Sequence, residues 1–413
     1  MKHVKTVLLA LLVACLVATA PAQAQVTEIS GNLGSVSYYH IKVPTPWNGT
    51  LVIWNHGFSL DPLEEVPDLG PLVAVQLSEG YAVAASSYRL RGWEAFRTTQ
   101  DLKNLYDVFR RNFGVPGQVI VTGGSLGGII TIQAIEQGNI GIVTGGLTMC
   151  GAVAGSRNWD GVVDARLLYD AVCGEVPGAA IRGGAAGLPK GSTFTWTDLG
   201  LALNACFGLL EPGGPTPEQL GRLGLFLSVA QVPANMVADE MWYATFGLAD
   251  LTWDPLKLSG KIGAGNLNVD YGNALINSRI ARVAPNPGAY AKLQADYTPT
   301  GDTRGAKIVS IHTDKDGIVL VENEKEYADV ADPALFTAAV VVENPATHCG
   351  FTAAETIASW ESLRMWLAGA PQPTPTSMQY VCNVIAAGDP TLGPCRIDPS
   401  FVIPDADGRI RPR

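Results

Sequence analysis

The sequence predicts an α/β protein with a doubly wound, mostly parallel sheet that a large, mainly helical insertion interrupts. Three observations lead to this prediction. Apolar strand-like segments alternate with amphipathic helical segments over residues 25–155, the alternation stops over residues 156–300, and it returns over residues 301–370. Strands that are apolar along their whole length are typical of parallel sheets with helices on both faces.

The composition is that of a folded, acidic protein. The 413 residues are 47% hydrophobic and 16% charged, and the formal net charge is −10. The length allows roughly two to three domains. An acidic chain without basic clusters argues against nucleic acid and anionic membrane surfaces as partners.

Residues 1–24 have the pattern of a secretory signal peptide. Lys2 and Lys5 precede a short apolar stretch, and Ala22-Gln23-Ala24 is a small-x-small cleavage site. Neither this stretch nor any other reaches the ~20 apolar residues that cross a membrane. We therefore expect a secreted or periplasmic protein without a membrane span. Cys15 and the three residues before it offer the alternative of a lipid anchor.

The first part of the core contains the elements of an α/β sheet. Leu102, Leu105, Tyr106 and Phe109 recur at helical spacing, and Gly114 ends that helix. The expected elements are one or two leading strands within 26–43, strands at 51–54, 81–85, 118–122 and 141–149, and helices over 98–113 and 129–137.

The rest of the chain divides into three segments. The insertion over residues 156–300 has helix-like pieces at 216–229 and 235–246 and carries four of the nine tryptophans. We interpret it as a lid, with a second domain as the alternative. The core then resumes with strands at 308–311 and 336–342 and helices near 319–330 and over 351–367. Residues 371–413 are predicted to be a Pro-rich linker and a disulfide-stapled C-terminal extension.

A glycine-rich turn around Ser125 carries the strongest functional signal. Gly123-Gly124-Ser125-Leu126-Gly127 follows a strand and precedes a helix, which is the context of a Gly-x-Ser-x-Gly nucleophile turn. Such a turn strains the serine backbone, so Gly123 and Gly127 must lack side chains for strand and helix to close. The helix N-terminus favours negative charge beside the serine. The pattern predicts that Ser125 is a catalytic nucleophile.

A serine nucleophile requires a base and a group that orients this base. His348 is the only histidine beyond the last predicted strand, where the base is expected. Asp316 and Asp314 both follow the strand 308–311, and we favour Asp316 as the acid because it stands at the start of the next helix. Two carboxylates after the previous strand are further alternatives: Asp160 and Asp164.

The remaining candidate residues surround the predicted nucleophile. Two backbone N–H groups are needed to bind an oxyanion, and we expect them from Leu126, which follows the serine, and from Phe58, which follows His56-Gly57. The aromatic side chains of the insertion are expected to contact an apolar or aromatic part of the substrate. The candidates are Trp159, Trp242, Tyr243 and Phe246.

With these residues the chain resembles the α/β-hydrolase-fold serine esterases and lipases of the secreted bacterial kind. The resemblance rests on His56-Gly57, the 123–127 turn, Asp316 and His348. It implies hydrolysis of a small-molecule or polymeric ester through an acyl-enzyme, with no metal or cofactor. A peptidase or amidase with the same triad is one alternative, and a non-catalytic binding protein on this fold is another.

Six cysteines follow the signal segment, and an even number in an exported chain indicates disulfides. Cys349 beside the predicted base is similar to the tannase and feruloyl esterase group, but Gly124 stands where that group has the matching cysteine. The preferred pairs are Cys150–Cys349, Cys173–Cys206 and Cys382–Cys395. The alternative joins Cys150 to Cys173 and leaves Cys349 to Cys206 or free.

Overall fold

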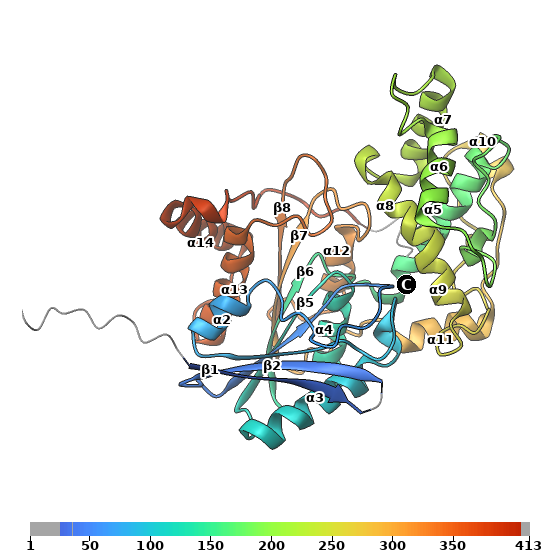
Figure 1. The fold of residues 1–413 in the computed structure, drawn as a ribbon. Helices are drawn as coiled ribbons and strands as arrows, with labels where there is room; N and C mark the ends of the chain where they lie inside the picture. Colours follow the sequence, from blue (N-terminus) through green and yellow to red (C-terminus); the bar gives the residue numbers. More distant parts are fainter. Residues whose placement is uncertain (1–24, 35, 406–413) are drawn as a thin grey trace, which may run out of the picture.

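A computed structural model describes residues 25–34 and 36–405, so the predicted signal segment and Cys15 lie outside the described residues. Eight strands form one sheet in the order β1-β2-β4-β3-β5-β6-β7-β8 (Figure 1). The first two strands are antiparallel to their neighbours, and the other six are parallel to one another. The strands are β1 (Gln25–Leu33), β2 (Ser37–Thr45), β3 (Thr50–Asn55), β4 (Ala82–Ser86), β5 (Gln118–Gly124), β6 (Val143–Met149), β7 (Lys307–Thr313) and β8 (Phe336–Val341).

Helices cover both faces of this sheet. Side chains of a strand alternate between faces, and in β3 Leu51 and Ile53 pack with α3 and α4, whereas Val52 packs with Trp360 of α13. Because both faces are buried, the whole strand is apolar, and the predicted doubly wound sheet is confirmed. The helices of the core are α2 (Val73–Ser78), α3 (Thr98–Phe113), α4 (Leu126–Gln137), α12 (Glu322–Ala328), α13 (Ala353–Leu367) and α14 (Pro375–Gly388).

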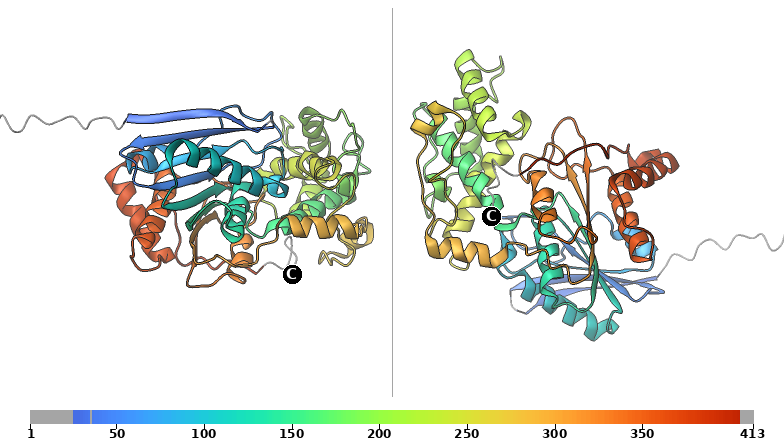
Figure 2. Two further views of the ribbon diagram at one scale, coloured as in Figure 1. Left: turned by 90° about the horizontal axis from the view of Figure 1, so that it is seen from below. Right: turned by 180° about the vertical axis from the view of Figure 1, so that it is seen from behind.

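The insertion between β6 and β7 is a helical lobe at one side of the sheet (Figures 1 and 2). Its buried residues, including Phe207 and Phe226, belong to the same apolar cluster as the α4 face of the sheet. The insertion is therefore packed onto the core through shared apolar contacts. Its helices are α5 (Asn158–Cys173), α6 (Trp196–Phe207), α7 (Pro217–Ala230), α8 (Val237–Trp242), α9 (Leu248–Trp253), α10 (Ala274–Arg279) and α11 (Pro287–Tyr297).

The helical piece expected at 235–246 is present and extends further, because a π-helical turn over Tyr243–Gly247 joins α8 to α9 in one continuous helical segment. One expectation about local structure is wrong: the Pro-rich linker is much shorter than expected, because α14 begins at Pro375. Proline is favourable at the first helical position, where its missing N–H has no helical partner, and Thr374 caps this helix end.

The C-terminal segment is part of the core. Met378 and Cys382 of α14 are buried in the cluster that includes α13. Beyond the helix, Ile397 forms an antiparallel bridge with Val341 at the end of β8. The segment therefore covers the outer edge of the sheet, an edge that would otherwise expose unpaired backbone groups.

Candidate active site

The turn between β5 and α4 holds Ser125 in a strained backbone conformation. Its φ of 56° is unusual for a residue with a side chain. The Ser125 N–H donates to Met149 O at 2.9 Å, which ties the turn to the end of β6. A Cβ on Gly127 would collide with Asn55 O, and one on Gly123 would collide with Gly127 O. The predicted strain and the need for both glycines are confirmed.

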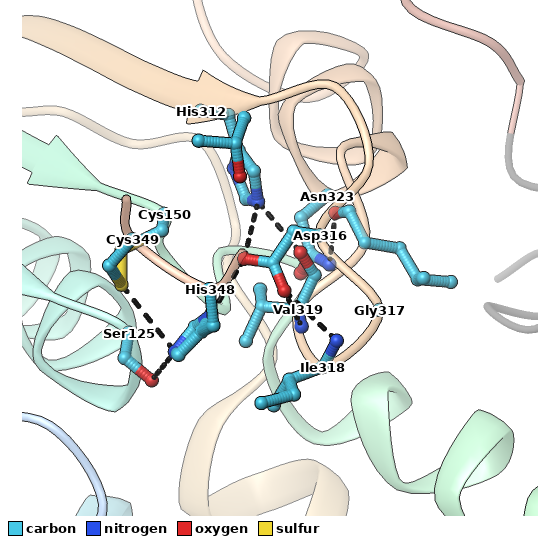
Figure 3. A network of polar contacts seen from close by, with 12 residues as sticks. Ser125, Cys150, His312, Asp316, Gly317, Ile318, Val319, Asn323, His348 and Cys349 are labelled. Atoms are coloured by element: carbon cyan, nitrogen blue, oxygen red, sulfur yellow. Dashed lines mark hydrogen bonds and ion pairs between the residues drawn. A yellow bond between two sulfur atoms is a disulfide. The ribbon is translucent and has the colours of Figure 1, made fainter. Parts of the chain in front are cut away.

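Ser125, His348 and Asp316 lie in hydrogen-bonding order (Figure 3). His348 Nε2 is 2.8 Å from Ser125 Oγ, and His348 Nδ1 is 2.6 Å from Asp316 Oδ2. The three residues follow β5, β8 and β7, whose carboxyl ends meet at one edge of the sheet. A neutral imidazole in this position can take the serine proton at Nε2 while Nδ1–H donates to the carboxylate.

The Asp316 carboxylate is fixed by its own turn. Its Oδ1 accepts hydrogen bonds from Ile318 N at 2.9 Å and Val319 N at 3.0 Å, which leaves Oδ2 for His348. Asp314 has a different place: its Oδ1 accepts from Glu343 N at 2.9 Å, and its Oδ2 pairs with Lys315. The other candidate acids lie in α5 of the insertion, where the Tyr271 hydroxyl donates to Asp164: Asp160 and Asp164.

Residues from three directions hold the loop that carries His348. The Thr347 hydroxyl donates to Glu343 Oε2 at 2.7 Å, and the Thr313 hydroxyl at the end of β7 donates to Thr347 O. Asn235 of the insertion donates from Nδ2 to Ala346 O at 2.7 Å. The insertion thus contacts the loop of the predicted base directly, so a shift of the insertion would move His348.

The six cysteines form three pairs, and one of them adjoins the site. Cys150 directly follows β6 and bonds Cys349, with Cα atoms 5.3 Å apart. Cys173–Cys206 lies in the insertion and Cys382–Cys395 in the C-terminal segment. Cys150, His348 and Cys349 are the one group of possible metal ligands found within residues 25–34 and 36–405. Because the two sulfurs are bonded to each other, this group offers no thiolate to a metal ion.

We expect reduction of Cys150–Cys349 to lower turnover before the fold melts. The bond fixes the residue after His348, and a displaced base can cost about tenfold to a hundredfold in rate. The measurement compares turnover and thermal unfolding of the Cys150→Ser/Cys349→Ser variant with those of Cys382→Ser/Cys395→Ser. A loss of turnover that only parallels the loss of folded protein, or equal losses in both variants, would contradict a role of this bond in positioning His348.

Two cavities meet at Ser125. The larger, about 390 Å³, is open and is lined by Trp54, Met149, Tyr243 and His348 among others. The smaller, about 40 Å³, lies beneath the insertion and is lined by apolar side chains together with three tryptophan and tyrosine side chains: Trp93, Trp159 and Tyr243. Phe58 and Tyr243 line both cavities and separate them. The serine hydroxyl therefore has a wide side and a narrow side.

The predicted aromatic residues do not all reach these cavities. Trp159 and Tyr243 line them, but Trp242 and Phe246 are absent from both linings. Trp242 packs edge-on against Phe58 and Tyr243, with ring centroids 6.0 and 5.0 Å away, and Phe246 packs on Trp242. Trp242 and Phe246 therefore support the residues that line the cavities, and their contact with substrate stays a prediction.

The two expected oxyanion donors lie beside the serine. Leu126 is the first residue of α4. Phe58 follows Gly57, which lies so close to the serine that a Cβ placed on Gly57 would be 3.4 Å from Ser125 Cβ. Burial lowers the pKa of His56, which precedes this loop and stacks on Tyr88 with ring centroids 4.1 Å apart. A neutral, stacked imidazole fits a structural role for His56.

Sequence reasoning missed two features of the site. Trp93 lines the small cavity, although it lies in an irregular loop far from the other predicted residues. His312 is fully buried beside Asp316, with Nε2 3.8 Å from Asp316 Oδ2. A signal for the second was present: Ser310 and His312 place polar side chains on one face of an otherwise apolar strand.

The strand order, the strained serine turn after β5 and the places of the residues after β7 and β8 are those of an α/β-hydrolase fold. No protein-family model matches the chain. A 115-residue stretch is 32% identical to the o-phthalyl amidase of Xanthobacter agilis. That match covers 27% of this chain and 24% of the amidase, so the chain spans about a quarter of the length of this relative.

Solved structures with a similar fold are enzymes of several kinds. Feruloyl esterase B from Aspergillus oryzae has a TM-score of 0.42 and 13% identity, covering 84% of this chain and 82% of its own. Candida antarctica lipase A in its closed state has a TM-score of 0.39 and 12% identity, and the match covers 91% of this chain and 95% of the lipase. Acylaminoacyl peptidase from Pyrococcus horikoshii has a TM-score of 0.39 and 13% identity, and the match covers 90% of this chain and 41% of the peptidase.

Proposed function

We propose that this protein is a serine hydrolase that cleaves carboxylic esters through an acyl-enzyme on Ser125. The observation that carries the proposal is the pair of hydrogen bonds at His348: Nε2 to Ser125 Oγ at 2.8 Å and Nδ1 to Asp316 Oδ2 at 2.6 Å. A serine hydroxyl becomes a nucleophile when a neutral imidazole takes its proton and a carboxylate stabilises the imidazolium that forms.

The proposed reaction uses each of these groups twice. Ser125 Oγ attacks the ester carbonyl while His348 Nε2 takes the proton, and the N–H groups of Leu126 and Phe58 bind the oxyanion. His348 then donates this proton to the leaving alcohol, which departs and leaves the acyl group on Ser125. Water then attacks the acyl carbon while His348 takes its proton, the bond from that carbon to Ser125 Oγ breaks, and His348 returns the proton to Ser125 as the carboxylic acid leaves.

The two cavities suggest how a substrate is divided about Ser125. The leaving alcohol must exit before water can enter, which favours the open cavity of about 390 Å³ for the alcohol. The acyl group stays bound during both steps, which favours the small cavity of about 40 Å³. We therefore propose a short acyl group and a larger alcohol, and we propose that the insertion acts as a lid over the acyl side.

The small cavity also favours an acyl group that carries an oxygen acceptor. Trp93 and Trp159 are 5% and 3% exposed, and the indole N–H of each has no hydrogen-bond partner among the described residues. An unsatisfied buried donor costs about 1–3 kcal/mol, which a substrate acceptor would recover once an indole ring turns its N–H into the cavity. Burial, with the nearby charges of Asp316, Asp239 and Glu240, raises the pKa of Tyr243 to about 12, so its hydroxyl is a donor as well.

Methoxyacetyl and butyryl esters of one alcohol test this preference, because they differ only in an oxygen that replaces a methylene group. After division by the rate of alkaline hydrolysis of each ester, we expect kcat/KM to favour methoxyacetyl by about tenfold. Trp159→Phe should bring this ratio towards one. Trp54→Phe is the matched control, because the indole N–H of Trp54 is also unpartnered while its ring lines the open cavity. A ratio near one in the wild type would contradict the proposed acyl class.

A substrate panel tests the reaction itself. We expect purified protein without residues 1–24 to hydrolyse p-nitrophenyl esters and to react covalently with a fluorophosphonate probe at Ser125. Peptidyl and phthalyl anilides form the amide arm, because the match to an o-phthalyl amidase favours amide cleavage as the second candidate. Faster cleavage of the anilides would make amidase the primary activity. Absence of both labelling and turnover would leave a non-catalytic binding protein.

We propose that the protein acts outside the cytoplasm, as a secreted or periplasmic enzyme. The three disulfides support an oxidising compartment, where such bonds persist. None of the described helices is long and apolar enough to cross a membrane. N-terminal sequencing of the exported protein would distinguish cleavage after Ala24 from lipid attachment at Cys15.

A further inference from the structure

His312 lies at the end of β7, four residues before Asp316, and is fully buried. Its two ring nitrogens each face an oxygen atom. Nδ1 is 2.8 Å from Glu324 Oε1 of α12, and Nε2 is 2.7 Å from Val319 O. A backbone carbonyl can only accept a hydrogen bond, so Nε2 of His312 carries a hydrogen.

The second nitrogen of His312 faces Glu324 Oε1, an oxygen that already accepts another hydrogen bond. The Ser310 hydroxyl donates to this oxygen at 2.7 Å, and Ser310 Oγ in turn accepts from the Thr148 hydroxyl at 2.7 Å. With Glu324 as a carboxylate, Oε1 accepts from both Ser310 and His312, and two donating nitrogens then make the His312 ring an imidazolium.

The surrounding charges support this protonation state. Burial by itself lowers the pKa of His312, but the hydrogen bond to Glu324 and the negative charges of Glu324 and Asp316 outweigh burial, and the pKa is raised. Glu324 faces the ring from α12 and Asp316 faces it from the following turn, while His348 and Tyr243 lie beyond Asp316. His312 thus stands between two buried carboxyl groups.

We propose that His312 is a protonated positioning residue that stabilises the Asp316 carboxylate and keeps His348 neutral at lower pH. The proposal rests on the proposed function of the triad. His312 Nε2 is 3.8 Å from Asp316 Oδ2, the same oxygen that accepts the hydrogen bond from His348 Nδ1 (Figure 3). A positive charge at this distance offsets part of the attraction between Asp316 and a protonated His348, so a resting His348 binds a proton less readily.

The charge of His312 can be measured without any turnover. In protein labelled with ¹⁵N-histidine, NMR reports whether one or both ring nitrogens carry a hydrogen, and His312→Gln identifies the signals of His312. We expect both nitrogens of His312 to stay protonated from pH 6 to pH 8. A singly protonated ring at pH 7 would overturn the proposal. This result does not depend on ester hydrolysis, so it stands apart from the test of the proposed function.

The effect on His348 is read from the pH profile of kcat/KM, whose acid limb reports protonation of the base in the free enzyme. We expect His312→Gln to move this limb to higher pH by about one unit, since loss of a buried positive charge favours protonation of His348. His40→Gln is the matched control. His40 also lies between a carboxylate, Glu28, and a backbone carbonyl, Pro67 O, but on β2.

A second variant covers the case in which His312→Gln does not fold. Glu324→Gln keeps the side-chain shape but removes the anion that holds the proton on His312, so the acid limb should move in the same direction. A folded His312→Gln or Glu324→Gln variant whose acid limb matches that of wild type would overturn the positioning role. A wild-type protein without ester turnover would instead refute the proposed function, and the NMR spectra would still decide the charge of His312.

Discussion

Ser125→Ala should lower turnover by at least about 10⁴-fold while the protein folds as the wild type does. The reason is that no acyl-enzyme forms without Oγ, although the cavities and the oxyanion donors remain. Alanine tolerates the positive φ at this position about as well as serine does, so the turn is preserved. The measurement is kcat/KM on a p-nitrophenyl ester, together with thermal unfolding.

The control for this prediction is Ser362→Ala, which removes a hydroxyl from the buried face of α13 and should keep full turnover. Fluorophosphonate labelling provides an independent readout, because it should vanish in Ser125→Ala and persist in Ser362→Ala. Turnover near the wild-type level in Ser125→Ala would refute the assignment of the nucleophile and with it the proposed mechanism.

Asp316→Asn should lower kcat by about 10⁴-fold, the effect of the same change in other triads. Oδ1 of Asp316 accepts two backbone N–H groups, so an amide would place its NH₂ group at the position of Oδ2, facing His348 Nδ1. Two donors cannot bond each other, and the imidazole would have to present its other tautomer. The base would then hold its hydrogen on Nε2, where Ser125 needs an acceptor.

Asp314→Asn is the matched control for the acid, because it makes the same chemical change two residues away. Its carboxylate accepts from Glu343 N and pairs with the ammonium group of Lys315, and these contacts support the loop without touching His348. We expect its turnover to stay within about tenfold of the wild type. A larger loss in Asp314→Asn than in Asp316→Asn would assign the acid to Asp314.

Much of this fold is predictable because the signals are local. The strands of the parallel sheet are apolar on both faces, and the turn at Ser125 needs glycine at fixed positions, so pattern alone locates both. The position of Asp316 also follows from local chemistry, since a carboxylate that begins a turn can accept its N–H groups. The C-terminal helix escapes prediction because Pro375 is as typical of a linker as of a first helical residue.

The parts that sequence reasoning missed depend on contacts between distant segments. The contact of His312 with Glu324 joins strand β7 to helix α12, and no pattern in β7 itself reveals that partner. Which aromatic residue of the insertion lines a cavity depends on how α8 and the π-helical turn after it pack against the core. Trp242 and Tyr243 are adjacent in sequence, yet only Tyr243 lines the cavities at Ser125.

The bond between Cys150 and Cys349 has a consequence for survival after cleavage by a protease. The two cysteines are 199 residues apart, and the whole insertion lies within the loop that they close. A single cut in an exposed loop of the insertion would divide the chain but would leave Ser125 on one fragment covalently joined to His348 on the other. Nicked enzyme would thus remain one molecule, with nucleophile and base still tethered, until a reductant released them.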